Sequence, residues 1–176
     1  AFTDKGRLAI ELVEWTQRAE DERRLASVEG ADFPLVVLDA YWKAAERMTL
    51  EEPGCGIPWW ALAGIGKVES RHGTYAGSEV RPDGSLTKPI IGIPLTGANG
   101  TAAIGDSDGG AIDGDPSVDR AAGPMQFIPQ TWARWGRDGD GNGEIEIQNI
   151  YDAAAGAAAY LCASGPMTDD AGLQRG

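Results

Sequence analysis

Basic residues and histidine are scarce in this sequence. Its 176 residues include 15 Lys plus Arg against 27 Asp plus Glu, for a formal net charge of -12, and a single histidine. Nucleic-acid binding rests largely on cationic side chains that neutralise phosphates, so this balance argues against nucleic acid as a partner and against an anionic membrane surface. The sequence also lacks a run of about 18 or more apolar residues, so we expect no transmembrane segment.

Cysteine is equally rare, with only Cys55 and Cys162. Two interpretations are open: one disulfide in an exported protein, or two buried thiols in a cytosolic protein. These counts exclude a zinc site with several His or Cys ligands. The single His72, together with the lack of a Gly-x-Ser-x-Gly motif, argues against a Ser-His-Asp triad, so His72 is expected to be structural. The chain opens at Ala1 without Met or a hydrophobic targeting segment, which indicates a processed product.

The N-terminal half has helical periodicity within a globular composition of 42% hydrophobic and 24% charged residues. The length suits one domain over residues 1–176. Apolar residues three and four apart predict helices over residues 8 to 30, 34 to 53 and 58 to 73. The predicted apolar stripe of the second helix is Leu35, Leu38, Trp42 and Ala45. Four tryptophans lie near helix-starting prolines and could stack on sugars, but a core position is the preferred interpretation: Trp59, Trp60, Trp132 and Trp135.

Residues 74 to 123 have little periodicity and are rich in glycine and aspartate. A loop of this length inside a compact domain is unusual, and such loops are usually functional or disordered. Short helices are predicted around 129 to 135 and 150 to 163, the latter closed by Gly165 and Pro166. The predicted fold class is therefore mainly α, with room for a small β-ribbon in the loop region.

Glu69 shares one face of the third predicted helix with Leu62 and Ile65. If that face points to the core, desolvation favours the protonated carboxyl and raises its pKa. A carboxylic acid that stays protonated near neutral pH is what general acid catalysis needs. The alternative is a solvated last-turn residue paired with Lys67 or Arg71.

A second candidate segment covers residues 122 to 132. Gly-Pro and Ile-Pro bracket a rigid turn that presents Gln126 and Phe127 before a helix. An amide beside an aromatic ring suits carbohydrate, because the amide bonds a hydroxyl or acetamido group and the ring packs on a sugar face. A polar turn above a core phenylalanine is an equally good interpretation.

A third candidate is an EF-hand-like loop that begins at Asp138. Oxygen ligands stand at loop positions one, three and five, glycine at six and a backbone carbonyl at seven. Position twelve is Asn149 instead of the usual Glu, so Asp152 or Glu146 has to supply the missing carboxylate. Asn149 also suits the N-cap of the last helix, and both roles are compatible. We expect a structural calcium ion held by Asp138, Asp140, Asn142, the Glu144 carbonyl and Asp152.

These three segments, in this order, resemble the B-type lytic murein transglycosylases, and most closely their secreted actinobacterial branch. The resemblance covers roughly residues 38 to 163 and rests on residues 66–73, on residues 123–129 and on the Asp138 loop running into Asp152. It implies a lysozyme-like catalytic core, peptidoglycan glycan strands as the substrate, and a secreted or cell-envelope location. We expect a monomer. The family usually has a Tyr-Asn pair and a further helix beyond the point where this chain stops, which is the basis for expecting a shortened C-terminus.

The resemblance also implies a role for particular residues. Glu69 matches the family's single catalytic acid, and Asp138, Asp140, Asn142 and Asp152 match its calcium ligands. A cell-wall substrate implies export, and export favours a Cys55–Cys162 disulfide that links the start of the Glu69 helix to the last helix. The matched substrate-binding positions are Ser117 near the acetamido group, and Gln126, Phe127 and Tyr160 along the sugar groove.

The implied reaction is non-hydrolytic cleavage of the β-1,4 bond between N-acetylmuramic acid and N-acetylglucosamine, which leaves 1,6-anhydro ends. One alternative is a lysozyme-type hydrolase of peptidoglycan or chitin-like glycans, in which a carboxylate of the acidic loop activates water. Another is a calcium-stabilised wall-binding module without turnover. The candidate bases of the hydrolase are Asp106, Asp108, Asp113 and Asp115, but a solvated loop or a second cation site is the preferred interpretation of this acidic segment.

Overall fold

The computed structural model describes residues 33–98 and 100–168. The chain divides into two compact units, Ala1–Asp32 and Phe33–Gly176, and the description below concerns the second. The helix predicted over residues 8 to 30 lies outside the described residues.

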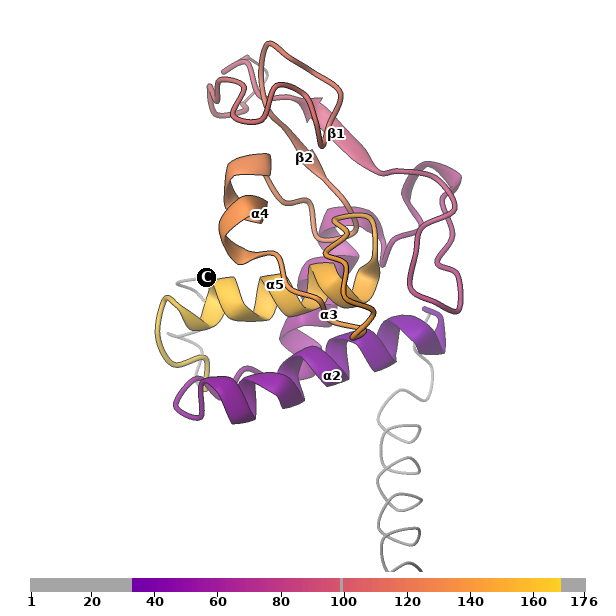
Figure 1. The fold of residues 1–176 in the computed structure, drawn as a ribbon, viewed down its shortest axis with the longest axis vertical. Helices are drawn as coiled ribbons and strands as arrows, with labels where there is room; N and C mark the ends of the chain where they lie inside the picture. Colours follow the sequence, from indigo (N-terminus) through magenta and orange to yellow (C-terminus); the bar gives the residue numbers. More distant parts are fainter. Residues whose placement is uncertain (1–32, 99, 169–176) are drawn as a thin grey trace, which may run out of the picture. The chain divides into compact units, whose positions relative to one another are not determined.

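Four α-helices make up most of the described unit (Figure 1): α2 (Leu35–Glu51), α3 (Trp59–Ser70), α4 (Pro129–Trp135) and α5 (Ile150–Cys162). Helix α2 packs along α5, and α3 and α4 also contact α5, so α5 is the central helix of the unit. Its alanine-rich sequence suits this place, because small side chains let neighbouring helices approach closely. Ala153, Ala154 and Ala158 are completely buried. The described helices include none that is long and apolar enough to cross a membrane.

The buried face of α2 differs from the predicted stripe. Leu38 and Ala45 are buried as predicted, but Leu35 is 63% exposed, because it lies in the first turn beyond the core. The largest side chain that α2 buries is Tyr41, which is completely buried beneath α3. A Cβ at Gly66 of α3 would lie 1.9 Å from the Tyr41 hydroxyl, so glycine at this position permits the close packing of the two helices.

The segment between α3 and α4 forms a set of short extended pairs. Strand β1 (Ile91–Pro94) is antiparallel to β2 (Arg120–Ala122), with Ile91 opposite Ala122. Isolated bridges join Val80 to Leu86, Thr96 to Ala103 and Gly105 to Val118, and a short 3-10 helix covers Tyr75–Gly77. The small ribbon predicted for this region is therefore confirmed, and it lies at the opposite end of the unit from α2 (Figure 1).

A disulfide joins Cys55, in the segment before α3, to Cys162 at the end of α5. Both cysteines are buried, and their Cα atoms are 5.3 Å apart. The backbone is also connected there, because the Met167 N–H donates to the Cys55 carbonyl at 2.6 Å. The predicted pairing is confirmed, and it connects the helix that carries Glu69 to the central helix.

Candidate active site

Glu69 is the penultimate residue of α3, where the helix ends three residues before the predicted stop at Gly73. Arg71 and His72 adopt left-handed backbone conformations with φ of 52° and 60°. Their N–H groups donate to the carbonyls of Lys67 and Gly66, which satisfies the last turn of the helix. Glu69, just before this abrupt end, lines a pocket.

Leu62, on the same face of α3, is completely buried, and Ile65 is half-buried. Glu69 is exposed at the helix end, yet enough protein surrounds its carboxyl that desolvation raises its pKa. The predicted direction of the shift is confirmed. Along this face of α3, burial therefore decreases from Leu62 through Ile65 to Glu69, which lies where the core meets solvent.

Ser70 connects the end of α3 to the turn that carries Gln126. Its side chain is 1% exposed; the hydroxyl donates to the Pro124 carbonyl at 2.6 Å and accepts from the Gly73 N–H at 2.8 Å. Buried polar groups are costly unless they are hydrogen-bonded, and here one hydroxyl satisfies two backbone groups. Ser70 therefore fixes the position of Glu69 relative to this turn.

The turn itself is held by backbone constraints. Gly123 has φ of 78°, and a Cβ there would lie 2.0 Å from the Ile147 carbonyl oxygen, so only glycine fits. Ala122 and Phe127 exchange backbone hydrogen bonds of 2.8 and 2.9 Å across the turn. Gln126 between them has a left-handed φ of 50°, an uncommon conformation for this residue, and its amide nitrogen donates to the Gly123 carbonyl at 2.9 Å. The turn presents Gln126 in a fixed orientation.

Two pockets share Glu69 and Gln126 in their walls. The larger, of about 630 Å³, lies between α3, the turn, α4 and α5. The smaller, of about 320 Å³, lies between the end of α3 and the β-ribbon. Glu69 is the only carboxylate among the described residues that line these two pockets. The larger pocket is mainly apolar, with walls that include Trp60, Ile65, Val68, Phe127, Tyr160 and Met167.

The other predicted substrate-binding residues divide into two groups. Phe127 and Tyr160 line the larger pocket; Phe127 is 6% exposed and packs against Trp132 with ring centroids 5.3 Å apart, and Tyr160 is exposed. Ser117 lines neither pocket, and its hydroxyl donates to Asp115.

His72 lies outside both pockets, buried against Phe33 and hydrogen-bonded to the Tyr41 hydroxyl at 3.2 Å, in agreement with a structural role.

Sequence reasoning missed Val68, Tyr75 and Arg120, which all line a pocket, and it preferred a core position over sugar stacking for Trp60, which also lines one. Trp60 was expected in the core, but it is 55% exposed. It shares a helix face with Gly64 and Val68, each four residues apart, and this face points away from the buried Leu62. Apolar or small residues at a spacing of four, on the face opposite the buried one, are the sequence pattern from which this pocket wall could have been predicted.

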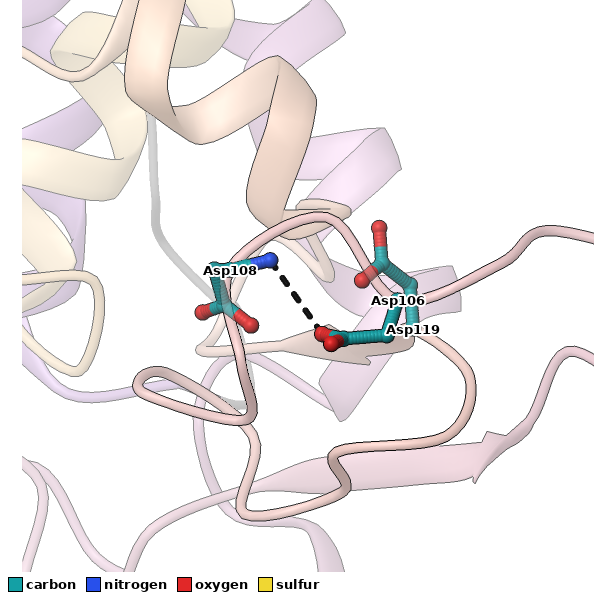
Figure 2. Close-up of side chains that lie close together, drawn as sticks. All are labelled: Asp106, Asp108 and Asp119. Atoms are coloured by element: carbon teal, nitrogen blue, oxygen red, sulfur yellow. Dashed lines mark hydrogen bonds between the residues drawn. The ribbon is translucent and has the colours of Figure 1, made fainter.

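The carboxylates of the acidic loop gather outside both pockets. Asp106, Asp108 and Asp119 have carboxylate oxygens within 4.8 Å of one another (Figure 2). Asp119 is completely buried and accepts from the Ser107 N–H and hydroxyl, and the Asp108 N–H donates to Asp106 at 3.2 Å. These carboxylates organise their own loop and line neither pocket.

A second acidic group lies between α4 and α5. The carboxylates of Asp138, Asp140 and Asp152 come within 4.8 Å of one another, and Asp152 is completely buried in the first turn of α5. Asn149 caps α5 by accepting from the Tyr151 N–H, as predicted, and its amide donates to Asp140 at 3.0 Å. A buried carboxylate beside two others is costly unless a cation neutralises it, so this group could hold a metal ion.

Residues 110–172 match the family described as Transglycosylase SLT domain. This match covers less than half of the chain, and for that segment it supports the predicted resemblance to transglycosylases.

Two solved structures of the Escherichia coli lytic transglycosylase Slt35 are similar to this chain. The complex with bulgecin A has 18% sequence identity and a TM-score of 0.42, over 86% of this chain and 54% of that one. The complex with calcium has 18% identity and a TM-score of 0.41, over 93% of this chain and 58% of that one. The chain thus spans little more than half the length of these structures. No curated protein matches the sequence.

Proposed function

We propose that this chain is a peptidoglycan lytic transglycosylase in which Glu69 is the single acid and base. The observation that carries the proposal is the position of Glu69, the one carboxylate among the described residues that line the two pockets. Most glycosidases need two carboxylates that flank the scissile bond, whereas a transglycosylase needs one. The candidate bases of a hydrolase, Asp106, Asp108, Asp113 and Asp115, line neither pocket.

The chemistry uses Glu69 twice. Protonated Glu69 donates its proton to the glycosidic oxygen between N-acetylmuramic acid and N-acetylglucosamine, and the bond to the anomeric carbon breaks while the 2-acetamido group assists at that carbon. The Glu69 carboxylate then takes the proton of the muramic 6-hydroxyl, whose oxygen attacks the anomeric carbon and closes a 1,6-anhydro ring. Glu69 ends in its starting state, and no water is consumed. The raised pKa of Glu69 supports the first step, because it favours the protonated form.

The shared walls of the pockets suit a sugar chain that passes Glu69 on both sides. Gln126 lines both pockets beside Glu69, so we propose that its amide binds a polar group of the sugars at the scissile bond. Phe127 and Tyr160 offer apolar surface along the larger pocket. Aromatic side chains in a pocket wall and a fixed amide together are the type of surface that binds sugar rings.

We also propose that calcium is bound by Asp138, Asp140, Asn142, the Glu144 carbonyl and Asp152. The fit is supported by the donor set, which is all oxygen, and by the close approach of the three carboxylates. The Arg47 guanidinium donates to the Asp138 carbonyl at 2.6 Å, which ties this loop to α2. The loop lines neither pocket, so its ion would stabilise the junction of α4 and α5 and take no part in the reaction.

The disulfide supports an extracytoplasmic location, because disulfides persist in oxidising compartments and are rare in the cytosol. Peptidoglycan lies outside the cytoplasmic membrane, so the proposed substrate and the disulfide agree. We propose secretion or residence in the cell envelope.

Mass spectrometry of the sugars released from purified peptidoglycan tests the reaction. The wild type is expected to give 1,6-anhydro products, lighter by one water than hydrolysed ones, and Glu69→Gln is expected to give none. Glu79→Gln is the matched control, because Glu79 is exposed and lines neither pocket. Circular dichroism confirms that each variant is folded.

The same assay separates the rival functions. Hydrated reducing ends that depend on Glu69 would identify a lysozyme-type hydrolase, and the proposed transglycosylase reaction would be wrong. Glycan binding that is equal in wild type and Glu69→Gln, with no product from either, would identify a wall-binding module.

A further inference from the structure

Arg120 is the only basic side chain among the described residues that line either pocket. It begins strand β2 and lines the smaller pocket together with Glu69 and Gln126. The whole chain carries a formal charge of -12, so a generally basic surface does not explain a guanidinium in this pocket wall. A role in that pocket is therefore to be sought for Arg120.

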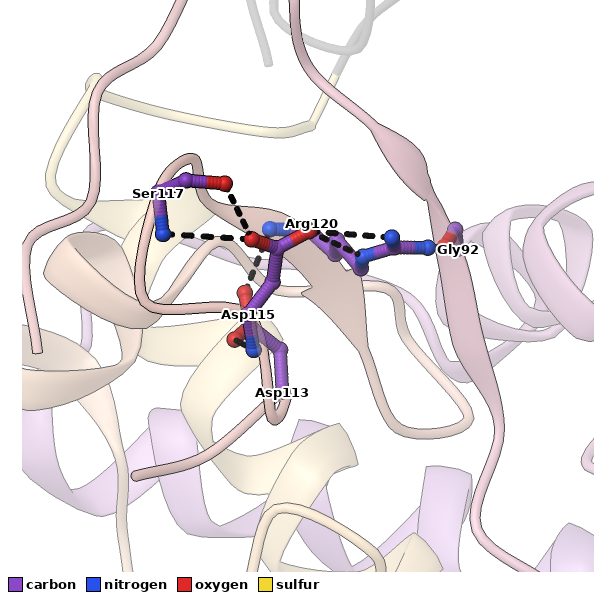
Figure 3. A network of polar contacts seen from close by, with 5 residues as sticks. All are labelled: Gly92, Asp113, Asp115, Ser117 and Arg120. Carbon is purple, nitrogen blue, oxygen red and sulfur yellow. Dashed lines mark hydrogen bonds and ion pairs between the residues drawn. The ribbon is translucent and has the colours of Figure 1, made fainter. Parts of the chain in front are cut away.

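The Arg120 guanidinium is held on two sides (Figure 3). Its Nε and Nη2 lie 3.0 and 2.9 Å from one carboxylate oxygen of Asp115, and its Nη1 lies 3.4 Å from the Gly92 carbonyl across the ribbon. The Ser117 N–H and hydroxyl both donate to the other oxygen of Asp115 and fix that carboxylate in turn. The Arg120 backbone N–H donates to the buried Asp113. Arg120 is thus oriented before any ligand binds.

The held guanidinium still has donors to offer. A guanidinium has five N–H donors, and the contacts described use three of them. The Arg120 side chain is 30% exposed, and that of Asp115 is 17% exposed, so Arg120 is the more accessible partner of the pair. A fixed, partly desolvated guanidinium with unused N–H groups is suited to bind a carboxylate.

We infer that Arg120 is a specificity-determining residue that binds a carboxylate carried by the sugar in the smaller pocket. The inference rests on the proposed function, in which the substrate alternates a neutral sugar with one that carries a carboxylate. That carboxylate is either the free lactyl group of N-acetylmuramic acid or an acidic group of the peptide attached to it. Asp115 and Ser117 then act as positioning residues for Arg120, which gives Ser117 a role outside the pockets.

Binding measurements in a Glu69→Gln background test this inference without turnover. Isothermal titration calorimetry compares three ligands: neutral chitotetraose, a peptide-free tetrasaccharide of alternating N-acetylglucosamine and N-acetylmuramic acid, and the same tetrasaccharide with stem peptides. We expect the ligand that carries the recognised carboxylate to bind about tenfold more tightly than chitotetraose, and Arg120→Gln to abolish this preference. Arg120→Lys is expected to keep only part of it, because an ammonium cannot hold Asp115 and a second carboxylate in the same geometry.

A control variant accounts for the change in net charge. Arg134→Gln removes the same charge from an exposed position on α4 that lines neither pocket, and it is expected to keep the preference. Thermal melts of Arg120→Gln report the cost of losing the Asp115 ion pair separately from the change in ligand preference.

The outcomes are distinct. Loss of preference for the peptide-free ligand would identify the lactyl carboxylate, and loss only for the peptide-bearing ligand would identify the peptide. If Arg120→Gln keeps the preference, or weakens all three ligands equally, the inference is wrong and Arg120 only clamps its loop. Anhydro products from the wild type together with that result would leave the proposed function standing. A preference that depends on Arg120, without any lytic product from the wild type, would overturn the proposed reaction and keep the inference.

Discussion

Glu69 combines an exposed position with a raised pKa, because desolvation at the pocket wall disfavours its charged form. General acid catalysis requires the protonated carboxyl in the free enzyme. We therefore expect kcat/KM to be highest below the raised pKa of Glu69 and to fall as the pH rises through it. Initial rates of anhydro-sugar release across the pH range measure this profile. A rate that increases steadily into the alkaline range would contradict Glu69 as the acid.

The same shift predicts how stability depends on pH. A carboxyl whose pKa is higher in the folded state than in the unfolded state binds more protons when folded, so its contribution to stability is lost as the pH rises through that interval. The Gln side chain of Glu69→Gln does not ionise, so the variant does not lose stability in this way as the pH rises. We expect the variant to melt at a higher temperature than the wild type at pH 7, and the difference to vanish below the unfolded pKa of about 4.3. If Glu79→Gln gives the same pattern, the effect is one of net charge and not of Glu69.

Ser70 offers a test of positioning at the same helix end. Ser70→Ala removes the hydroxyl that bonds the Pro124 carbonyl and the Gly73 N–H, and it leaves both groups unsatisfied in a buried place. We expect a loss of about 1–3 kcal/mol in the free energy of unfolding and a lower kcat well below the melting temperature. Ser78→Ala is a matched control, since Ser78 is also buried and bonds a backbone carbonyl, but lines neither pocket. An equal kcat for both variants would show that Ser70 only stabilises.

Sequence reasoning found Glu69 but not Arg120, and the difference is physical. Glu69 is marked by local periodicity, because Leu62 and Ile65 on its face define where the core lies. Arg120 enters the site through the pairing of β2 with β1, almost thirty residues away in sequence, at Gly92. A contact of this kind depends on how the loop closes, and neither spacing nor composition specifies it.

At the scale of elements, the positions of the helices were predictable from the sequence, but which face of each helix is buried was only partly predictable. Prolines 34, 58 and 129 marked the starts of α2, α3 and α4 to within one residue. The face that α2 buries depends on Tyr41 fitting against Gly66, a contact between two helices that periodicity within one helix does not contain. The bridges of the long loop are equally non-local, because they join residues such as Gly105 and Val118.

The loop between α4 and α5 carries the prediction for calcium. An ion that binds only the folded state stabilises it, by about 2.7 kcal/mol at a concentration 100 times its Kd. We expect chelation to lower the melting temperature and added calcium to restore it, and Asp138→Asn to abolish the response. Asp106→Asn, in the acidic cluster of the other loop, serves as the control and should still respond. A melting temperature indifferent to chelator and calcium would show that the Asp138 loop needs no ion.

At the scale of the whole described unit, the larger pocket lies between α3 and α5, and a disulfide connects the segment before α3 to the end of α5. Trp60 and Val68 come from α3, and Tyr160 and Leu161 come from α5. The disulfide links the segment before α3 to the end of α5, across a sequence separation of 107 residues. The site therefore depends on a constraint between distant parts of the chain, and not only on the packing of α3 against α5.

Breaking this constraint is expected to affect stability and the site together. Replacing Cys55 and Cys162 with alanine removes the cross-link, and we expect a loss of roughly 2–4 kcal/mol in the free energy of unfolding, measured by urea denaturation. Reduction of the wild type should give a similar loss, which separates the effect of the bond from that of the side chains. Because the pocket walls are less constrained, kcat should also decline at temperatures at which the oxidised protein is still fully folded. Two titratable thiols in the denatured, unreduced protein would mean that the bond does not form, and the stability and the pocket would then rest on packing alone.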